Sequence, residues 1–103
     1  MRLPWMRVAV SGLSMTPTLA PGEWLIVRNG APPRPGRVVV VRLPERMVVK
    51  RVVRQTDDGG WWVEGDNLDA SDDSRVFGPV RREAVVGEVR WRYRPLRSAG
   101  RVR

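Results

Sequence analysis

The hydrophobic and polar positions along the chain predict short strands separated by turns. Apolar stretches alternate with turn-forming residues, and the many valines, with 9 prolines and 10 glycines, favour strands over long helices. Strands are expected at 5–10, 23–28, 37–43, 46–54, 61–64 and 84–93, with one helical turn at 81–83. The predicted fold is therefore all-β, a small domain of short, mostly antiparallel strands with at most one helical turn.

Two of these strands carry the strongest burial signals. The run of valines in 37–43 predicts a strand that is buried on both faces. In 46–54 alternate side chains share a face, so Val48, Lys50 and Val52 point the same way. Lys50 then lies between two valines, a setting that lowers the pKa of an amine. The alternative is that its stem packs on the valines while the ammonium reaches water.

Length and charge limit the organisation and the partners. A chain of 103 residues has room for one domain, expected at 1–93, followed by a basic, mobile tail at 94–103. The net charge of +8 suits nucleic acid, an anionic membrane surface or an acidic partner. No apolar run is long enough to span a membrane, and 1–10 is too short and too charged for a signal peptide. We expect a cytoplasmic location, with membrane association as the second choice.

The candidate chemistry centres on Ser14. Gly12 and Pro17 constrain its turn, which presents the hydroxyl, but a serine needs a neighbouring base to become a nucleophile. The chain has no Cys and no His, so thiolate chemistry, disulfides and the usual base and metal ligand are excluded. Of its basic residues eighteen are arginine and only Lys50 is lysine. Arginine stays protonated whereas a buried lysine can lose its proton, so Lys50 is the candidate base; the alternative is a lysine that survived a bias toward arginine.

A polar, acidic stretch at 65–75 is predicted to be a surface loop fixed by Asx-type hydrogen bonds. A calcium loop is disfavoured there because the glycine and final glutamate of an EF-hand are missing from the required positions.

Three motifs then stand in one order along the chain. They are Ser-Met-x-Pro-Thr-Leu from Ser14, Lys-Arg-Val-Val from Lys50, and Gly-Asp-Asn-x-x-x-Ser-x-Asp-Ser-Arg-x-x-Gly-x-Val from Gly65. Together they resemble the type I signal peptidase family of serine proteases, which use a serine-lysine dyad on an all-β fold. The resemblance implies a small signal-peptidase-like catalytic β-domain with Ser14 as nucleophile and Lys50 as general base.

The resemblance also implies supporting roles. Ser71 orients the lysine, Asp73 and Arg75 pair to brace the site, and Gly12 stands where many bacterial members have a serine that helps to hold the oxyanion. Met15 and Pro17, in the first motif, are expected to contact the substrate. Without the resemblance, Ser71 is better explained as a loop cap, and the Asp73–Arg75 pair as an ordinary surface ion pair. No cofactor and no metal are implied.

The implied reaction is removal of an N-terminal peptide from a partner protein. The family's membrane anchor and second β-domain are not found in this chain, whose size and layout resemble the nickel-type superoxide dismutase maturation proteases. The precursor of that enzyme is therefore the expected substrate, with a signal peptidase-type protease lacking its anchor as the alternative.

Two further readings concern the charge and the tryptophans. A nucleic-acid-binding β-barrel would use the +8 charge and five Trp, but the arginines are spread along the chain, so nucleic acid is not expected as a partner. A rim of Trp5, Trp24, Trp61 and Trp62 would give weak contact with a membrane surface. The alternative is that at least two of the tryptophans lie in the core.

Overall fold

The chain folds into one twisted, seven-stranded sheet in which every strand pair is antiparallel. The computed structural model describes residues 3–70 and 72–103. Its strands are β1 (Trp5–Ala9), β2 (Trp24–Asn29), β3 (Val38–Arg42), β4 (Met47–Gln55), β5 (Trp61–Glu64), β6 (Val85–Arg94) and β7 (Gly100–Arg101). The all-β prediction is confirmed, and each expected strand lies within one residue of its observed bounds.

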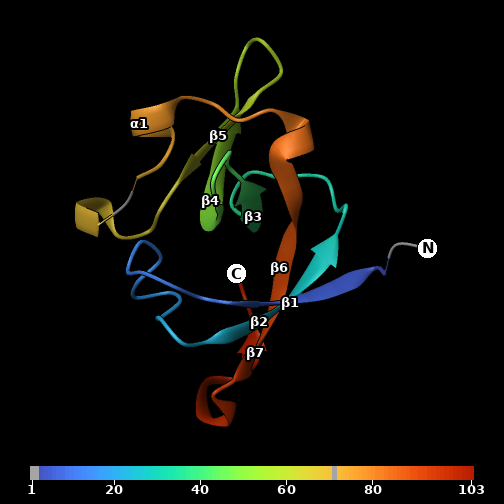
Figure 1. Ribbon diagram of the computed structural model, residues 1–103, viewed down its shortest axis with the longest axis vertical. Helices are drawn as coiled ribbons and strands as arrows, with labels where there is room; N and C mark the ends of the chain where they lie inside the picture. Colours follow the sequence, from blue (N-terminus) through green and yellow to red (C-terminus); the bar gives the residue numbers. More distant parts are fainter. Residues whose placement is uncertain (1–2, 71) are drawn as a thin grey trace.

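Strand β6 connects the two halves of the molecule. The strand order is β1-β2-β6-β3-β4-β5, and β7 pairs with β6 outside this path. Figure 1 shows β6 running from an upper half, with β3, β4 and β5, into a lower half with β1, β2 and β7. Where β6 passes β2 the backbones come so close that a Cβ atom on Gly87 would lie 2.3 Å from the carbonyl oxygen of Arg28. Only glycine satisfies that approach.

The alternating valines of β3 supply two hydrophobic cores. Val38 and Val40 belong to a core that also contains Leu25, Val27 and Val89, together with Met15 and Leu19 of the serine turn. Val39 and Val41 belong to a second core, whose other members are Val52, Val63, Val80 and Val85. The prediction that this strand is buried on both faces is confirmed.

In the part of the chain that the structure describes, four short helical segments interrupt the strands, more than the single turn expected. They are η1 (Leu68–Ala70), α1 (Ser74–Phe77), η2 (Arg82–Ala84) and η3 (Leu96–Ser98). Only η2 was expected, one residue earlier than it lies. The others are three or four residues long, too short to show a helical period, and they depend on local hydrogen bonds such as the one that caps α1.

The prediction of a mobile tail at 94–103 is wrong. β6 continues to Arg94, η3 reverses the chain, and β7 returns along β6 with Trp91 opposite Arg101. Val102 is 7% exposed and packs in the first core. Backbone pairing needs no apolar run, and Val102 alone anchors the segment in the core, so the basic composition gave no sign that it is folded.

The tryptophans are not core residues. Trp5, Trp24 and Trp91 are exposed, while Trp61 and Trp62 are half-buried, so the expectation of at least two core tryptophans is wrong. Trp61 packs against the edge of the second core. In the described ranges, 3–70 and 72–103, no helix is long and apolar enough to cross a membrane.

Candidate active site

The turn that carries Ser14 is anchored by its own apolar side chains, which pack in the first core. Met15 and Leu19 are almost fully buried in the first core, and the amide of Leu19 donates to the carbonyl oxygen of Met15 over 2.9 Å. Gly12 has a φ of +79°, a left-handed conformation that favours glycine. Ser14 itself is half-buried, so its side chain remains accessible while the buried Met15 and Leu19 hold the turn in place.

Lys50 lies on β4 and is buried among the valines of that strand. It is only 3% exposed, so the alternative in which its ammonium reaches water is wrong. Burial lowers the pKa of Lys50 from its ordinary value of 10.5, while Asp73 opposes this and Arg46 adds to it. The amine therefore loses its proton more readily than a lysine in water.

Ser14 and Lys50 line the same cavity, which has a volume of about 430 Å³. Its apolar wall is formed by Val8, Val10, Leu13, Met15, Val40, Met47, Val48 and Val49. Gly12 also lines it, and Arg46, Asp69 and Asp72 form its polar side. The cavity thus combines a hydroxyl, an amine and an apolar wall. Of the two residues expected to contact substrate, Met15 lines this cavity and Pro17 does not.

Asn67 ties the serine turn to the loop after β5. Its backbone amide donates to the carbonyl oxygen of Ser14 over 2.8 Å. Its side-chain amide donates to the carbonyl oxygen of Leu13 over 3.1 Å and to Oγ1 of Thr16 over 2.9 Å. Sequence reasoning matched Asn67 to the third motif but gave it no role, because contacts between segments so far apart leave no local pattern.

A second set of contacts, through Arg51 and Asp66, joins all three of the motifs found in the sequence. Nε and Nη2 of Arg51 donate to the two carboxylate oxygens of Asp66, each over 2.8 Å, and the hydroxyl of Thr18 donates to Oδ2. The bond from Arg51 lowers the pKa of Asp66. Arg51 also donates to the carbonyl oxygens of Gly36 and Arg103. The residue next to Lys50 is therefore held at several points, which fixes this part of β4.

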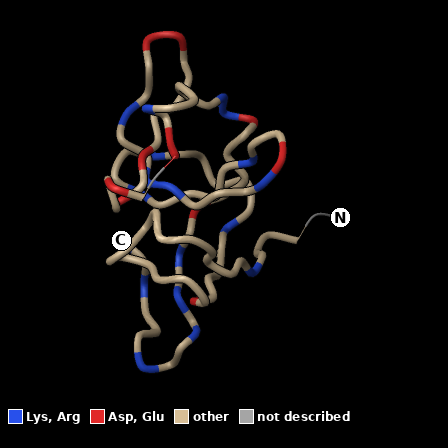
Figure 2. Tube along the Cα trace, turned by 60° about the vertical axis from the view of Figure 1, so that its left-hand side comes forward, with Lys and Arg blue, Asp and Glu red and all other residues tan. Residues whose placement is uncertain are grey.

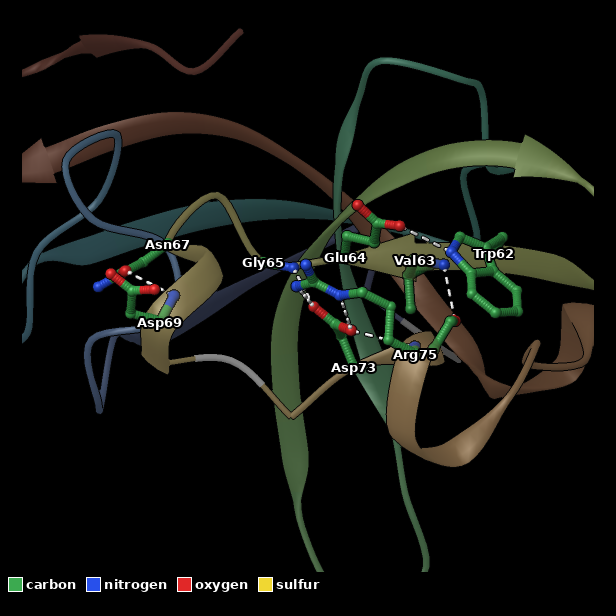
Figure 3. A network of polar contacts seen from close by, with 9 residues as sticks. Trp62, Val63, Glu64, Gly65, Asn67, Asp69, Asp73 and Arg75 are labelled. Atoms are coloured by element: carbon green, nitrogen blue, oxygen red, sulfur yellow. Dashed lines mark hydrogen bonds and ion pairs between the residues drawn. The ribbon is translucent and has the colours of Figure 1, made fainter.

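Asp73 and Arg75 form the expected ion pair, but outside the cavity lining. Asp73 is 0% exposed, so the pair is more than a surface contact and 65–75 is not wholly a surface loop. Asp73 accepts hydrogen bonds from the backbone amides of Gly65, over 2.9 Å, and Arg75, over 3.1 Å. Figure 3 shows this carboxylate between the end of β5 and the start of α1.

The expected Asx-type hydrogen bonds are found at Asp73 and at Asn67, whose Oδ1 accepts from the amide of Asp69. The predicted role of Ser71 concerns a residue outside the described ranges. Within those ranges, no group of three acidic side chains is arranged to hold a metal ion.

Comparison with known proteins agrees with this arrangement. The family model described as Peptidase S24-like matches residues 5–89. Mitochondrial inner membrane protease subunit 1 of Xenopus tropicalis is 32% identical, over 90% of this chain and 71% of that protein. Mitochondrial ATP-independent inner membrane protease subunit 1a of Arabidopsis thaliana is 33% identical, over 91% of this chain and 73% of that protein. The human mitochondrial inner membrane protease subunit 1 is 27% identical, over 93% of this chain and 74% of that protein.

These matches, on an all-β domain, define a serine protease of the signal-peptidase-like kind, whose substrates are proteins. The chain belongs to the Peptidase S24-like family.

Proposed function

We propose that the protein is a serine endopeptidase in which Ser14 is the nucleophile and Lys50 the general base. The observation that carries this proposal is the shared cavity, where a half-buried serine on an anchored turn and a buried lysine with a lowered pKa both form the lining. A serine needs a base near it, and a lysine serves as one only when its amine is neutral.

The chemistry is acyl transfer in two stages. The neutral amine of Lys50 takes the proton of the Ser14 hydroxyl as Oγ attacks the carbonyl carbon of the scissile bond. The resulting ammonium returns the proton to the departing amine, which leaves an ester on Ser14. Lys50 then takes a proton from water as the water oxygen attacks the ester carbon, and returns that proton to Oγ of Ser14 as the acid leaves, which restores the hydroxyl and the neutral amine. The backbone N–H of Ser14 is the first donor to the oxyanion, and Gly12 lies beside it on the same turn.

Burial of Lys50 moves the ionisation of its amine toward neutral pH, because it lowers the pKa of Lys50. With an unshifted pKa, deprotonating the amine at pH 7 would cost about 4 to 5 kcal/mol. The lowered pKa reduces this cost, so the protein environment contributes directly to the rate.

For the substrate we propose the N-terminal extension of a precursor protein. The apolar wall of the cavity suits apolar side chains beside the scissile bond. The resemblance to the nickel superoxide dismutase maturation proteases makes that precursor the specific candidate. The relatives are named inner membrane proteases, which favours a second candidate, a precursor protein that is cleaved near a membrane surface.

The supporting roles implied by the resemblance complete the proposal. Ser71 would orient the amine of Lys50, so Ser71→Ala should lose part of the activity rather than all of it. Asp73 and Arg75 would brace the site from behind, through the contacts that Asp73 makes at the end of β5.

The test compares wild-type protein with Ser14→Ala on both candidate precursors. Wild type should release a defined N-terminal peptide, identified by mass spectrometry, and Ser14→Ala should release none while keeping its melting temperature, because a turn hydroxyl adds little stability. Full activity of purified Ser14→Ala would refute the nucleophile assignment. Cleavage of only one precursor would decide between the two substrates.

A further inference from the structure

A second groove lies at the η3 end of the molecule and has no part in the proposed chemistry. It has a volume of about 680 Å³ and is lined by residues 20–24 and 94–97; we call it the η3 groove. Its apolar lining includes Trp24, which is 38% exposed, and Leu96, which is 85% exposed. An exposed leucine beside a tryptophan is a surface that gains from being covered.

The charge of the η3 groove is positive. Arg94 and Arg97 line it and are exposed, and within the described residues neither forms an ion pair. The single carboxylate of the groove, Glu23, already accepts from Arg92 over 3.2 Å and from the amide of Ala20 over 2.7 Å. Figure 2 shows basic positions at this end of the trace and acidic positions at the opposite tip.

The η3 groove adjoins the strand that leads to the serine turn. The amide of Gly22 donates to the carbonyl oxygen of Val10 over 2.9 Å, and the amide of Val10 donates to the backbone carbonyl oxygen of Glu23 over 2.8 Å. Val10 lines the active-site cavity, whereas Gly22 and Glu23 line the groove. One pair of backbone hydrogen bonds thus joins the lining of the active-site cavity to the lining of the η3 groove. A substrate protein bound at Ser14 therefore lies near the η3 groove.

We propose that the η3 groove is a docking site for the substrate protein, and that it takes an acidic segment with an apolar residue, outside the scissile bond. This inference rests on the proposed protease function. Carboxylates of the segment pair with Arg94 and Arg97, while its apolar side chain covers Leu96 and Trp24. A hollow with a tryptophan wall suits a peptide segment better than the flat surface of a bilayer.

The groove would supply selectivity that the cavity cannot. A cavity with an apolar wall discriminates weakly among peptides with apolar side chains, because one methylene changes affinity by only about 1 to 3 kcal/mol. Docking at a second place raises the local concentration of the scissile bond and restricts cleavage to proteins that carry the segment.

The first experiment measures binding without cleavage. Ser14→Ala protein is titrated by calorimetry with a decapeptide of glutamate and leucine, and with the same peptide in which glutamine replaces glutamate. Binding of the acidic peptide should weaken at least about tenfold in an added Arg94→Glu, Arg97→Glu pair and fall with salt. The matched control is the pair Arg54→Glu, Arg81→Glu, which reverses two exposed arginines elsewhere. Equal effects of both pairs, or equal binding of both peptides, would overturn the inference.

The second experiment uses the active enzyme. With the precursor as substrate, Arg94→Glu with Arg97→Glu should raise KM at least about tenfold with little change in kcat, and leave cleavage of a short peptide spanning the scissile bond unchanged. An unaltered KM for the precursor would overturn the groove assignment. If wild type cleaved neither the precursor nor the short peptide, the protease proposal would fail. The calorimetric titration with the acidic peptide would still test whether the η3 groove binds such a segment. If the Arg94→Glu, Arg97→Glu variant lost binding to phosphatidylglycerol vesicles but still bound the acidic peptide as wild type does, the occupant of the groove would be a lipid and the inference would be refuted.

Discussion

The backbone amide of Asn67 donates to the carbonyl oxygen of Ser14 over 2.8 Å, so a residue from the loop after β5 holds the backbone of the proposed nucleophile. The two side-chain bonds of Asn67, to Leu13 and Thr16, fix the turn on either side. The position of the hydroxyl is therefore set by a distant segment as well as by the turn itself.

Asn67→Ala should lower kcat while KM changes little. The substitution keeps the backbone bond to Ser14 but removes both side-chain donors, so the turn gains freedom at the reacting atom. A displacement of about 1 Å can cost up to 100-fold in rate, and we expect a loss of about tenfold. Steady-state kinetics on a short peptide would measure it. Asn67→Asp, which cannot donate, should resemble Asn67→Ala; an unchanged kcat in both would show that the turn needs no such support.

Lys50→Arg and Lys50→Met should both be inactive. Arginine keeps the charge but stays protonated at any usable pH, and methionine keeps only the apolar volume. For wild type, kcat/KM should rise with pH along one ionisation below the ordinary value of 10.5, because the free enzyme is active only with its amine neutral. Peptide cleavage followed from pH 6 to 10 would test this. Activity in Lys50→Arg would remove the base from the mechanism.

Stability should depend on pH through the same residue. Because the folded state has the lowered pKa, the unfolded state binds the extra proton between that pKa and 10.5. The free energy of unfolding should therefore rise with pH across this window, by up to about 1.4 kcal/mol per pH unit, and stay constant below it. Urea unfolding of wild type and Lys50→Met gives the difference, since the variant lacks this dependence. A difference that is independent of pH would contradict the lowered pKa.

Asp66→Asn should destabilise the protein by about 1.5 to 3 kcal/mol, the range for hydrogen bonds to charged groups. The substitution removes the carboxylate that accepts two bonds from Arg51 and one from Thr18. The pKa of Asp66 is lowered by Arg51, so its contribution is present above the ordinary value of 3.8 and is lost as pH falls below it. Urea unfolding at pH 7 would measure the change. Asp57→Asn, at the exposed tip of the β4–β5 turn, is the control and should change little.

Gly87→Ala should destabilise the sheet by about 1 to 3 kcal/mol, as overpacking does. The added Cβ would lie 2.3 Å from the carbonyl oxygen of Arg28, so β2 and β6 must separate. The melting temperature would report the loss. Gly59→Ala, in an exposed turn with open space around the new atom, should cost less, although its φ of +87° is unfavourable to alanine. If the two variants had the same melting temperature, the close approach of β2 and β6 at Gly87 would not limit the stability of the protein.

The strands were predictable because their signals are local. The valines of β3 and the alternation around Lys50 depend on residues next to one another, and burial of Lys50 followed from that alternation. The turn with Ser14 was recognisable from Gly12 and Pro17, and the structure places Ser14 and Lys50 in one cavity, as a dyad requires.

What the sequence could not predict depends on contacts between distant segments. Asn67 meets the serine turn, Arg51 meets the carbonyl oxygen of Arg103, and Val102 fills a space left by other elements. The sequence around each of these residues shows no pattern that predicts such a contact. The three short helical segments that were not expected, η1, α1 and η3, are similar, because they follow from local hydrogen bonds rather than from a repeating pattern.

The position of β6 sets an order of events during synthesis. β2 follows the turn with Ser14 and β4 carries Lys50, yet the strand between β2 and β3 comes later in the chain than either. A ribosome therefore releases the proposed nucleophile and base well before Gly87 reaches the tunnel exit, and until then the two halves have no shared sheet. A nascent chain should consequently be unable to cut its neighbours, and pairing over such sequence separation predicts slow folding once β6 emerges.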